Sequence, residues 1–557
     1  MRRTAASLFL IAGLLPVDIA GIASAQESFG VSSETDSYLI DQKILPTADE
    51  LKGSRPKADP SNIQPAATSL QGSLNELKSP PSLSLPNHPS QVRIRELRPL
   101  TLAEVEQLAE VNSPQLKAAA LEVQQAKASL RAAISSWYPN LNIGANGLPQ
   151  YLAGEQRIYT PDSPETLTYT DRTSANFNAQ LNWDLINPSR VPEISAARDN
   201  FERVSDSYLI ALRDLRLTAA QAYYTLQRYD SQVNVGKESV AASLLSLRYA
   251  RSRFQAGVAT KLEVLEAETQ LSRDKDNLNG YLNFQSRARR NLARILDLPY
   301  DVTPTAASPS RIVGTWKPSL QESIIAAFAF REELDQLILD RSINNSNANA
   351  ALAAVQPVLA IYSSFNTQGF QGEANVLPPV NNDVGGWSFD NAVGLSASWN
   401  IFDGGRARAE YRRNKLLAEA SAYEFANQRG VIRLQVEQSF YDLLDNQTAI
   451  RTTTREVLSQ REALRLARLR FAAGVTTQRE VVDNQRDLTR AQVRHVDSLS
   501  DYNITIAELR RYTGLDQVVS CPLLNLSDEK AQTPESETIL IKPLPNIPAC
   551  QALVLGS

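Results

Sequence analysis

The chain has 557 residues, and its 57 Lys and Arg against 61 Asp and Glu give a net charge of −4, so charge gives no reason to expect nucleic acid as a partner. Hydrophobic residues make up 43% and charged residues 21%, which provides enough apolar material for a core and excludes wholesale disorder. Two Cys and two His leave little material for metal or thiol chemistry, and we expect no metal site and no cofactor.

The chain begins with the pattern of a secretory signal peptide. Two arginines precede an apolar run from Ala5 to about Val17, and a small-residue cleavage pattern ends at Ala25. We therefore predict a signal peptide at residues 1–25 and an exported mature chain; the alternative is a short amphipathic helix. Pro and Ser are frequent in residues 26–99, where we predict a disordered linker.

The remainder divides into two similar parts and a tail. We expect a first structural repeat at residues 100–300, a linker at 301–318, a second repeat at 319–515 and a Pro-rich tail at 516–557. The tail holds both cysteines, Cys521 and Cys550, and either a disulfide or two free thiols would fit an exported chain.

The two parts share one sequence plan at a nearly constant offset. The segment Leu247–Val258 returns as Leu464–Val475, about 217 residues later, with the common pattern Leu-Arg-x-Ala-Arg-x-Arg-Phe-x-Ala-Gly-Val. Trp183 and Trp399 are separated by a similar step. An offset that is kept over the whole unit predicts a tandem duplication.

Each repeat opens with a helix and a pair of strands. In the first repeat, apolar spacing predicts one helix from Leu102 to about Ser136, then strands at 138–144 and 177–183 around a long polar loop. In the second repeat, strands are predicted at 358–365 and 393–402. Four of the five Trp lie in or near these strands, which is typical of a membrane barrel wall; a soluble sheet with core aromatics is the alternative.

Very long helices follow the strands. Proline is absent from Glu193 through Leu298 and from Val380 through Cys521. A helix of about 65 residues ending at Gly257 would be about 100 Å long. Gly257 and Gly474 are predicted to end these long helices and to turn each into a hairpin.

Apolar residues at strict seven-residue steps predict left-handed helix seams in both copies. In the first copy they are Leu212, Ala219, Leu226, Val233, Val240, Leu247 and Phe254, and in the second they are Val436, Leu443, Ile450, Val457, Leu464 and Phe471.

This plan requires assembly. Four strands cannot close a membrane barrel, because the smallest such barrels have eight strands, and an open sheet in lipid would leave its edges unpaired. Three copies would supply twelve strands and a ring of helices. We therefore expect several chains to share one barrel.

The chain resembles the TolC family of outer-membrane exit ducts. The resemblance rests on the duplication, on Phe-x-x-Gly-Val at both hairpin tips, on Trp399 to Gly405 (Trp-Asn-Ile-Phe-Asp-Gly-Gly) and on the strand pairs between helices, and it covers about Leu100 to Leu515. It implies a mixed fold: coiled-coil hairpins forming an α-barrel, and four strands per chain in a trimeric transmembrane β-barrel. It further implies a homotrimer in outer membrane lipid with a periplasmic tunnel, a periplasmic adaptor protein and an inner-membrane transporter as partners, and drug efflux or type I protein secretion as the task.

The resemblance also implies a narrow point just beyond the second tip, where rings of carboxylates would favour cations. The matching residues are Glu480 and Asp483, and Glu263 and Glu266 hold the same offsets in the first copy; an ordinary solvated helix face is the alternative. The family's latch has a basic residue where this chain has Thr476, so an ion pair from that position to Glu263 is excluded.

The hairpin tips are the candidate adaptor dock, although these residues would also be explained by the turn alone: Phe254, Gly257, Val258, Phe471, Gly474 and Val475. We find no catalytic motif and expect no enzyme; His495 is expected to be a surface histidine. The competing interpretations are a periplasmic adaptor, which would need a β domain split around one hairpin, and a pore-free coiled-coil scaffold in the periplasm or on the cell surface.

Overall fold

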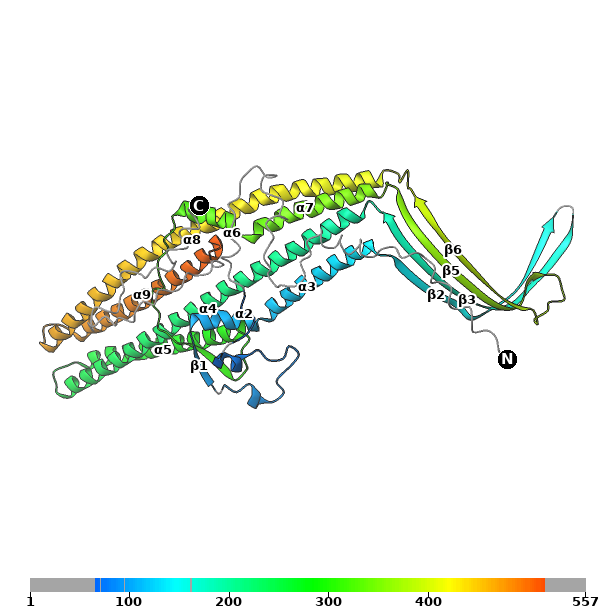
Figure 1. The fold of residues 1–557 in the computed structure, drawn as a ribbon. Helices are drawn as coiled ribbons and strands as arrows, with labels where there is room; N and C mark the ends of the chain where they lie inside the picture. The colour runs from blue at the N-terminus through cyan, green and yellow to red at the C-terminus, as the bar shows by residue number, and fades with distance from the viewer. Residues whose placement is uncertain (1–65, 71, 95, 161–162, 516–557) are drawn as a thin grey trace. The chain divides into compact units, whose positions relative to one another are not determined.

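A computed structural model describes residues 66–70, 72–94, 96–160 and 163–515 (Figure 1). The predicted signal peptide, the first part of the predicted linker and the tail with Cys521 and Cys550 lie outside the described residues.

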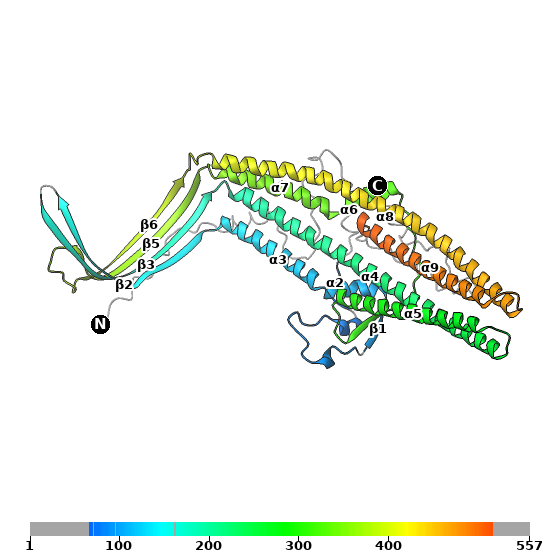
Figure 2. The same ribbon diagram turned by 180° about the vertical axis from the view of Figure 1, so that it is seen from behind.

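The described chain passes twice through one order of elements: a short strand, two helices, two strands and two very long helices (Figures 1 and 2). The first series consists of β1 (Glu96–Leu100), α2 (Leu102–Asn112), α3 (Pro114–Ile134), β2 (Asn140–Thr160), β3 (Ser163–Ile186), α4 (Arg190–Gln255) and α5 (Lys261–Ile295). The second consists of β4 (Val302–Ala306), α6 (Leu320–Phe330), α7 (Glu332–Ala353), β5 (Val358–Val376), β6 (Gly385–Ser398), α8 (Arg406–Ala472) and α9 (Gln478–Thr513). Short 3₁₀ turns η3 (Gly72–Leu77), η4 (Pro89–Gln91) and η5 (Ser135–Trp137) complete the described elements.

The first predicted helix is in fact two helices, α2 and α3. Ser113 separates them and caps α3 by accepting a hydrogen bond from the backbone N–H of Leu116, and Pro114 occupies the first helical position. Proline is tolerated at that position but disfavours a helical residue before it, which explains the break.

Four strands form one antiparallel sheet in the order β2-β3-β5-β6. The prediction of a long loop between the first two strands is wrong, because β2 and β3 continue through the polar stretch and pair from Asn140↔Asn182 to Thr160↔Ser163. Thr and Tyr in this stretch favour extended backbone, and pairing satisfies the peptide groups of both segments. The last strand is also shifted: it spans Gly385–Ser398 and ends before the predicted residues 399–402.

The long helices confirm the seven-residue pattern. α4 has 66 residues and α8 has 67, and Pro192 falls in the first turn of α4, where a missing N–H breaks no helical hydrogen bond. α5 packs back along α4 and α9 along α8, with apolar clusters in each seam. Of the seam positions, those that are at most 5% exposed are Leu212, Ala219, Leu226, Val233, Leu247, Val436, Leu443, Ile450, Val457 and Leu464.

Part of the predicted linker is folded. Leu74 and Leu77 of η3 are buried in a core with Leu108 of α2 and Leu292 of α5. β1 also begins inside the predicted linker, and it pairs in parallel with β4. Leucines at helical spacing supply enough apolar surface to hold a segment whose overall composition is that of a linker.

Within the described ranges, no helix is both long enough and apolar enough to cross a lipid bilayer.

Candidate functional site

The sheet has one apolar and one polar face. Apart from Asn391, the odd-numbered residues of β6 are apolar or glycine, such as Trp387, Val393 and Leu395, whereas its even-numbered residues are small or polar. The register extends this division across the sheet, because Leu395 lies opposite Ile361 of β5, and Ile361 lies opposite Trp183 of β3. Asn and Gln align on the other face, in the pairs Asn140↔Asn182 and Asn142↔Gln180.

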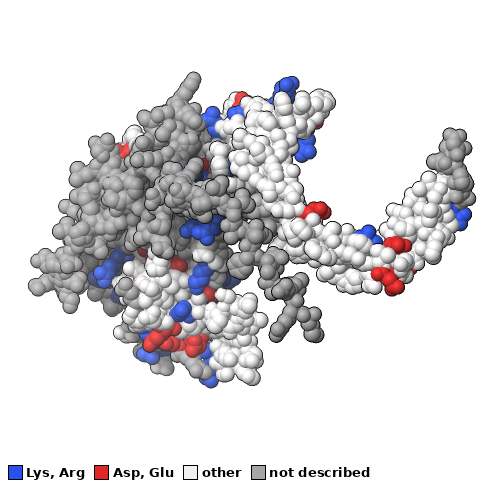
Figure 3. All heavy atoms as spheres, turned by 45° about the vertical axis from the view of Figure 1, so that its right-hand side comes forward, with Lys and Arg blue, Asp and Glu red and all other residues white. Residues whose placement is uncertain are grey.

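The apolar face is exposed in the single chain. Trp387 is 73% and Leu395 66% exposed, and Trp387 stacks on Phe389 with ring centroids 5.7 Å apart. Figure 3 shows that the surface of this sheet carries few charged side chains. A sheet with exposed alternating apolar residues on one face requires an apolar medium or a partner to cover them.

Both long helices end in the same turn. Gly257 and Gly474 have φ of 73° and 74°, the left-handed conformation predicted for them. The N–H of Val258 donates to the carbonyl of Arg253 (3.0 Å), and the N–H of Gly257 donates to the carbonyl of Phe254 (3.0 Å), which is a Schellman motif. Val475, Gly474, Phe471 and Arg470 repeat these bonds at the same lengths.

Three of the four apolar tip side chains are exposed. Val258 is 63% and Val475 66% exposed, and Phe254 is also exposed, whereas Phe471 is half-buried under the guanidinium of Arg253, 4.5 Å from its ring centroid. The backbone hydrogen bonds and the left-handed glycine account for the turn. The exposed valines are therefore not needed to form it.

The two acidic residues beyond the second tip both contact arginines. Glu480 accepts a 2.9 Å hydrogen bond from Arg470 Nη1 and another from Thr476 Oγ1. Asp483 forms an ion pair with Arg486, with 3.0 Å between Oδ1 and Nη1. Thr476, the residue in the latch position, thus binds the acid of its own hairpin.

The acidic residues of the first copy are arranged differently. Glu263 forms a capping box with Thr260: its carboxylate accepts from the backbone N–H of Thr260 (3.3 Å), and the Thr260 hydroxyl accepts from the N–H of Glu263 (3.3 Å). Glu263 therefore stabilises the start of α5. Glu266 lies one turn further along the same helix and is half-buried.

A row of polar pairs joins α4 to α9, and we call it the α4–α9 polar seam. Its contacts are Gln221 with Glu508 (2.9 Å), Gln232 with Asp497 (2.7 Å), Ser239 with Thr489 (3.2 Å), and Ser246 with Gln478. The two hairpins are thus connected by hydrogen bonds, in contrast to the apolar seam inside each hairpin.

The comparisons with known proteins agree with this geometry. The sequence model described as outer membrane efflux protein matches residues 105–297 and 326–515, more than half of the chain. The chain belongs to the outer membrane efflux protein family. Membership places it among transport channels of the outer membrane, in agreement with the resemblance inferred from the hairpin tips.

Individual relatives of this efflux protein are distant. It is 25% identical to the pyoverdine export outer membrane protein OpmQ of Pseudomonas putida, over 70% of this chain and 81% of the relative. It is 21% identical to the outer membrane protein TolC of Vibrio cholerae, over 74% of this chain and 90% of the relative. The structure of the outer membrane protein VceC of Vibrio cholerae superposes with a TM-score of 0.59 at 17% identity, covering 74% of this chain and 96% of VceC.

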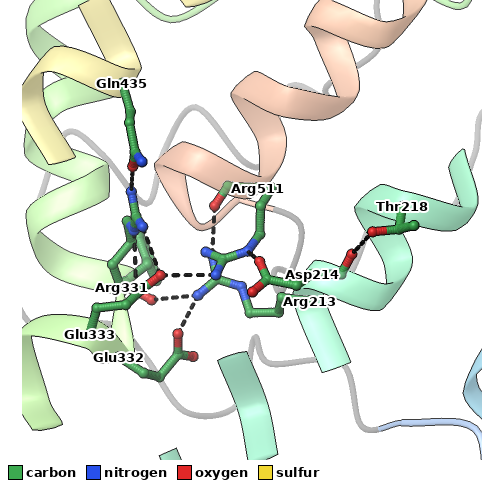
Figure 4. A network of polar contacts seen from close by, with 9 residues as sticks. Arg213, Asp214, Thr218, Arg331, Glu332, Glu333, Gln435 and Arg511 are labelled. Carbon is green, nitrogen blue, oxygen red and sulfur yellow. Dashed lines mark hydrogen bonds and ion pairs between the residues drawn. The ribbon is translucent and has the colours of Figure 1, made fainter. Parts of the chain in front are cut away.

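The efflux protein also contains a buried charge network that its sequence did not indicate (Figure 4). Arg213 of α4 contacts Glu332 at the start of α7 and donates to the backbone carbonyl of Arg511 in α9 (2.8 Å). Arg511 in turn donates to Asp214 (2.7 Å) and to Glu333 (2.9 Å). Arg213, Glu332 and Arg511 are each at most 4% exposed.

The two glutamates of the network have opposite pKa shifts. Burial raises the pKa of Glu332, which the charge of Arg213 only partly offsets. Burial acts on Glu333 in the same direction, but hydrogen bonds from Arg331 and the charge of Arg511 outweigh it and lower the pKa of Glu333 well below its usual value. Arg331 also reaches α8 through a 2.6 Å hydrogen bond to Gln435, so the network connects four helices.

Two tryptophans tie the sheet to the helices that precede it. Trp183 Nε1 donates to the carbonyl of Trp137 (3.0 Å), and Trp399 Nε1 donates to the carbonyl of Val355 (3.0 Å). The same bond therefore occurs at matching places in both series of elements.

His495 is not the surface histidine that we expected. It is half-buried, and its Nδ1 lies 3.2 Å from the hydroxyl of Thr453 on α8. Burial lowers its pKa. Among the described residues, no cluster of His, Cys, Asp and Glu has the arrangement of a metal site.

Proposed function

We propose that this efflux protein is a homotrimeric exit duct, in which three chains share a twelve-stranded barrel in the outer membrane and their helices form a tunnel in the periplasm. Cargo would pass from an inner-membrane pump to the exterior, in a tripartite efflux pump or a type I secretion system. The proposal assigns no catalytic step to the chain.

The exposed apolar face of the sheet carries this proposal. Within the described chain, β2 and β6 each pair on one side only, so the four-stranded sheet has two open edges. In lipid, both the apolar face and the open edges are satisfied if sheets from several chains join edge to edge into a closed barrel. The Asn and Gln face would then line the lumen.

We also propose that the chain arose by tandem duplication, with repeats at 100–300 and 319–515 joined by residues 301–318. Three observations support it: the element order occurs twice, the family model matches two stretches, and the Trp183 and Trp399 bonds are equivalent.

Two sets of residues would do the work of the duct. Glu480 and Asp483 would form acidic rings at the narrowest point, with Glu263 and Glu266 of the first hairpin as weaker candidates. A periplasmic adaptor would dock on the exposed tips: Phe254, Gly257, Val258, Phe471, Gly474 and Val475. The exposure of Val258 and Val475 supports this role, because the Schellman turn itself does not need them exposed.

Planar-bilayer conductance of the detergent-purified protein tests the proposal. We expect cation-selective steps, and we expect Glu480→Ala with Asp483→Ala to enlarge them and to weaken the selectivity. Glu410→Ala with Glu437→Ala is the matched control, because it removes two carboxylates that pair with arginines on α8 away from the tip. Unchanged steps in the tip variant would refute the constriction, and a protein that stays soluble without detergent would favour the scaffold interpretation.

A further inference from the structure

A cavity of about 480 Å³ lies between the two hairpins near their tips. All four long helices line it, with Leu245 and Tyr249 from α4, Ala267 from α5, Phe471 from α8, and Val481 from α9. This volume lies in the range of pockets that enclose small organic ligands, and an apolar lining with few polar groups is typical of such pockets.

The charged residues that line the cavity are all cationic. Arg253 of α4 and Arg468 of α8 contribute to the wall, and none of the lining residues is Asp or Glu. Arg253 lies over the ring of Phe471, and Arg468 donates to the amide oxygen of Gln485 (2.9 Å). Two nearby arginines outside the cavity do have carboxylate partners: Arg251 pairs with Glu268, and Arg465 pairs with Glu462. The cavity therefore has a local positive charge that no carboxylate in its wall balances.

Two buried polar atoms in this wall also lack partners. Gln478 is 1% exposed, and its Nε2 donates to Ser246, but its Oε1 has no hydrogen-bond partner among the described residues. The Nε of Arg253 is likewise buried without a partner there. Both atoms are therefore free to form a hydrogen bond with a water or a ligand in the cavity.

We propose that this cavity binds a small amphipathic organic anion with an aromatic ring, such as an aryl carboxylate. The ring would pack against Tyr249 and Phe471, and the anionic group would pair with Arg253 and Arg468, because guanidinium groups bind carboxylates with two parallel hydrogen bonds. One arginine belongs to each hairpin. A bound anion would therefore connect the hairpins and stabilise the arrangement in which they are in contact.

Equilibrium dialysis of the full-length protein in zwitterionic lipid nanodiscs tests this inference, with radiolabelled 1-naphthoate as the probe and empty nanodiscs as the blank. We expect saturable binding that weakens at least tenfold in Arg253→Gln with Arg468→Gln. Arg251→Gln with Arg465→Gln is the matched control, since it removes the same charge from the same two helices outside the cavity, and it should bind as the unaltered chain does. The neutral analogue 1-naphthalenemethanol should bind more weakly and should not distinguish the variants.

Equal naphthoate binding in both double variants would overturn the inference, as would equal binding of the neutral analogue. A second variant, Ala242→Phe, fills the cavity without changing its charge and should also abolish binding. Persistent binding in this variant, with its helix content unchanged by circular dichroism, would place the probe elsewhere and refute the site. Dialysis measures binding alone, so a negative result here leaves the conductance experiment unaffected.

Discussion

Arg470 in the last turn of α8 donates a 2.9 Å hydrogen bond to Glu480 in the first turn of α9, across the Gly474 turn. One carboxylate of the proposed acidic ring therefore has a cation of its own hairpin beside it. Because the arginine cancels part of the field of Glu480, we expect Arg470→Gln to increase the preference of the channel for cations. The reversal potential under a KCl gradient measures this change.

The control for that experiment is Arg465→Gln, which removes an arginine one and a half turns earlier that pairs with Glu462 on an exposed face. It should leave the reversal potential near that of the unaltered protein. Equal shifts in both variants would mean that only the total charge of the tip matters, and that the contact between Arg470 and Glu480 has no specific effect.

Loss of an arginine from the buried network should lower the free energy of unfolding much more than loss of an exposed arginine. Arg213→Met should destabilise the helical part by about 3 to 5 kcal/mol, because it removes one charge of a buried ion pair with Glu332. Arg433→Gln, which breaks an exposed pair with Glu437, should have little effect. Urea unfolding followed by far-UV circular dichroism provides both values. Equal stabilities would show that water or another cation replaces Arg213.

Replacement of glycine by alanine should have opposite effects on stability at two positions, one inside α8 and one in the turn that follows it. Gly474→Ala places a side chain at a φ of 74° and should cost about 1 to 2 kcal/mol. Gly430→Ala lies inside the helix with open space around the new methyl group, and should stabilise the protein by about 0.4 to 1 kcal/mol. Thermal unfolding of the two variants side by side checks the signs; a stabilised Gly474→Ala protein would contradict the turn described above.

His495 predicts a dependence of stability on pH. Burial lowers its pKa in the folded chain, so the unfolded chain binds the proton more readily, and stability should fall as pH decreases below the unfolded value of about 6.5. His495→Gln should remove this part of the loss, so the stability of the variant relative to the unaltered protein should rise as the pH falls from 7 to 5. Parallel curves for the two proteins over this range would show that the pKa of His495 is the same in the folded and the unfolded chain.

Local patterns explain why the long helices and their turns could be predicted. The seven-residue step and the glycines at 257 and 474 act over a few turns of one chain segment, so the sequence alone specifies them. The sequence predicts strands that are too short, because the polar, Thr-rich stretch inside β2 and β3 resembles a loop until the pairing of the two strands is known. Pro114 itself indicates a break between α2 and α3, but the apolar spacing continues across it and predicts a single helix.

The missed residues depend on contacts between distant parts of the chain. Arg213 and Arg511 are 298 residues apart, and nothing near either residue marks them as partners. The same holds for Leu74 and Leu77, whose burial depends on surfaces supplied by α2 and α5. The composition of a segment predicts its disorder only when no such surface is available.

The long helices are held together in two ways: by apolar packing inside each hairpin and by the α4–α9 polar seam between the hairpins. Inside each hairpin, separating the helices would expose leucines and valines to water, as in an obligate interface. Between the hairpins, water can replace the partner of Gln232 or Ser239 after separation, so the net loss per hydrogen bond is small. The buried network of Arg213 and Arg511 holds α4 and α9 together at one end. Nearer the tips, where Gln232 and Ser239 lie, the hairpins can therefore separate while each stays folded, and solutes that compete for hydrogen bonds should loosen this part before they unfold either hairpin.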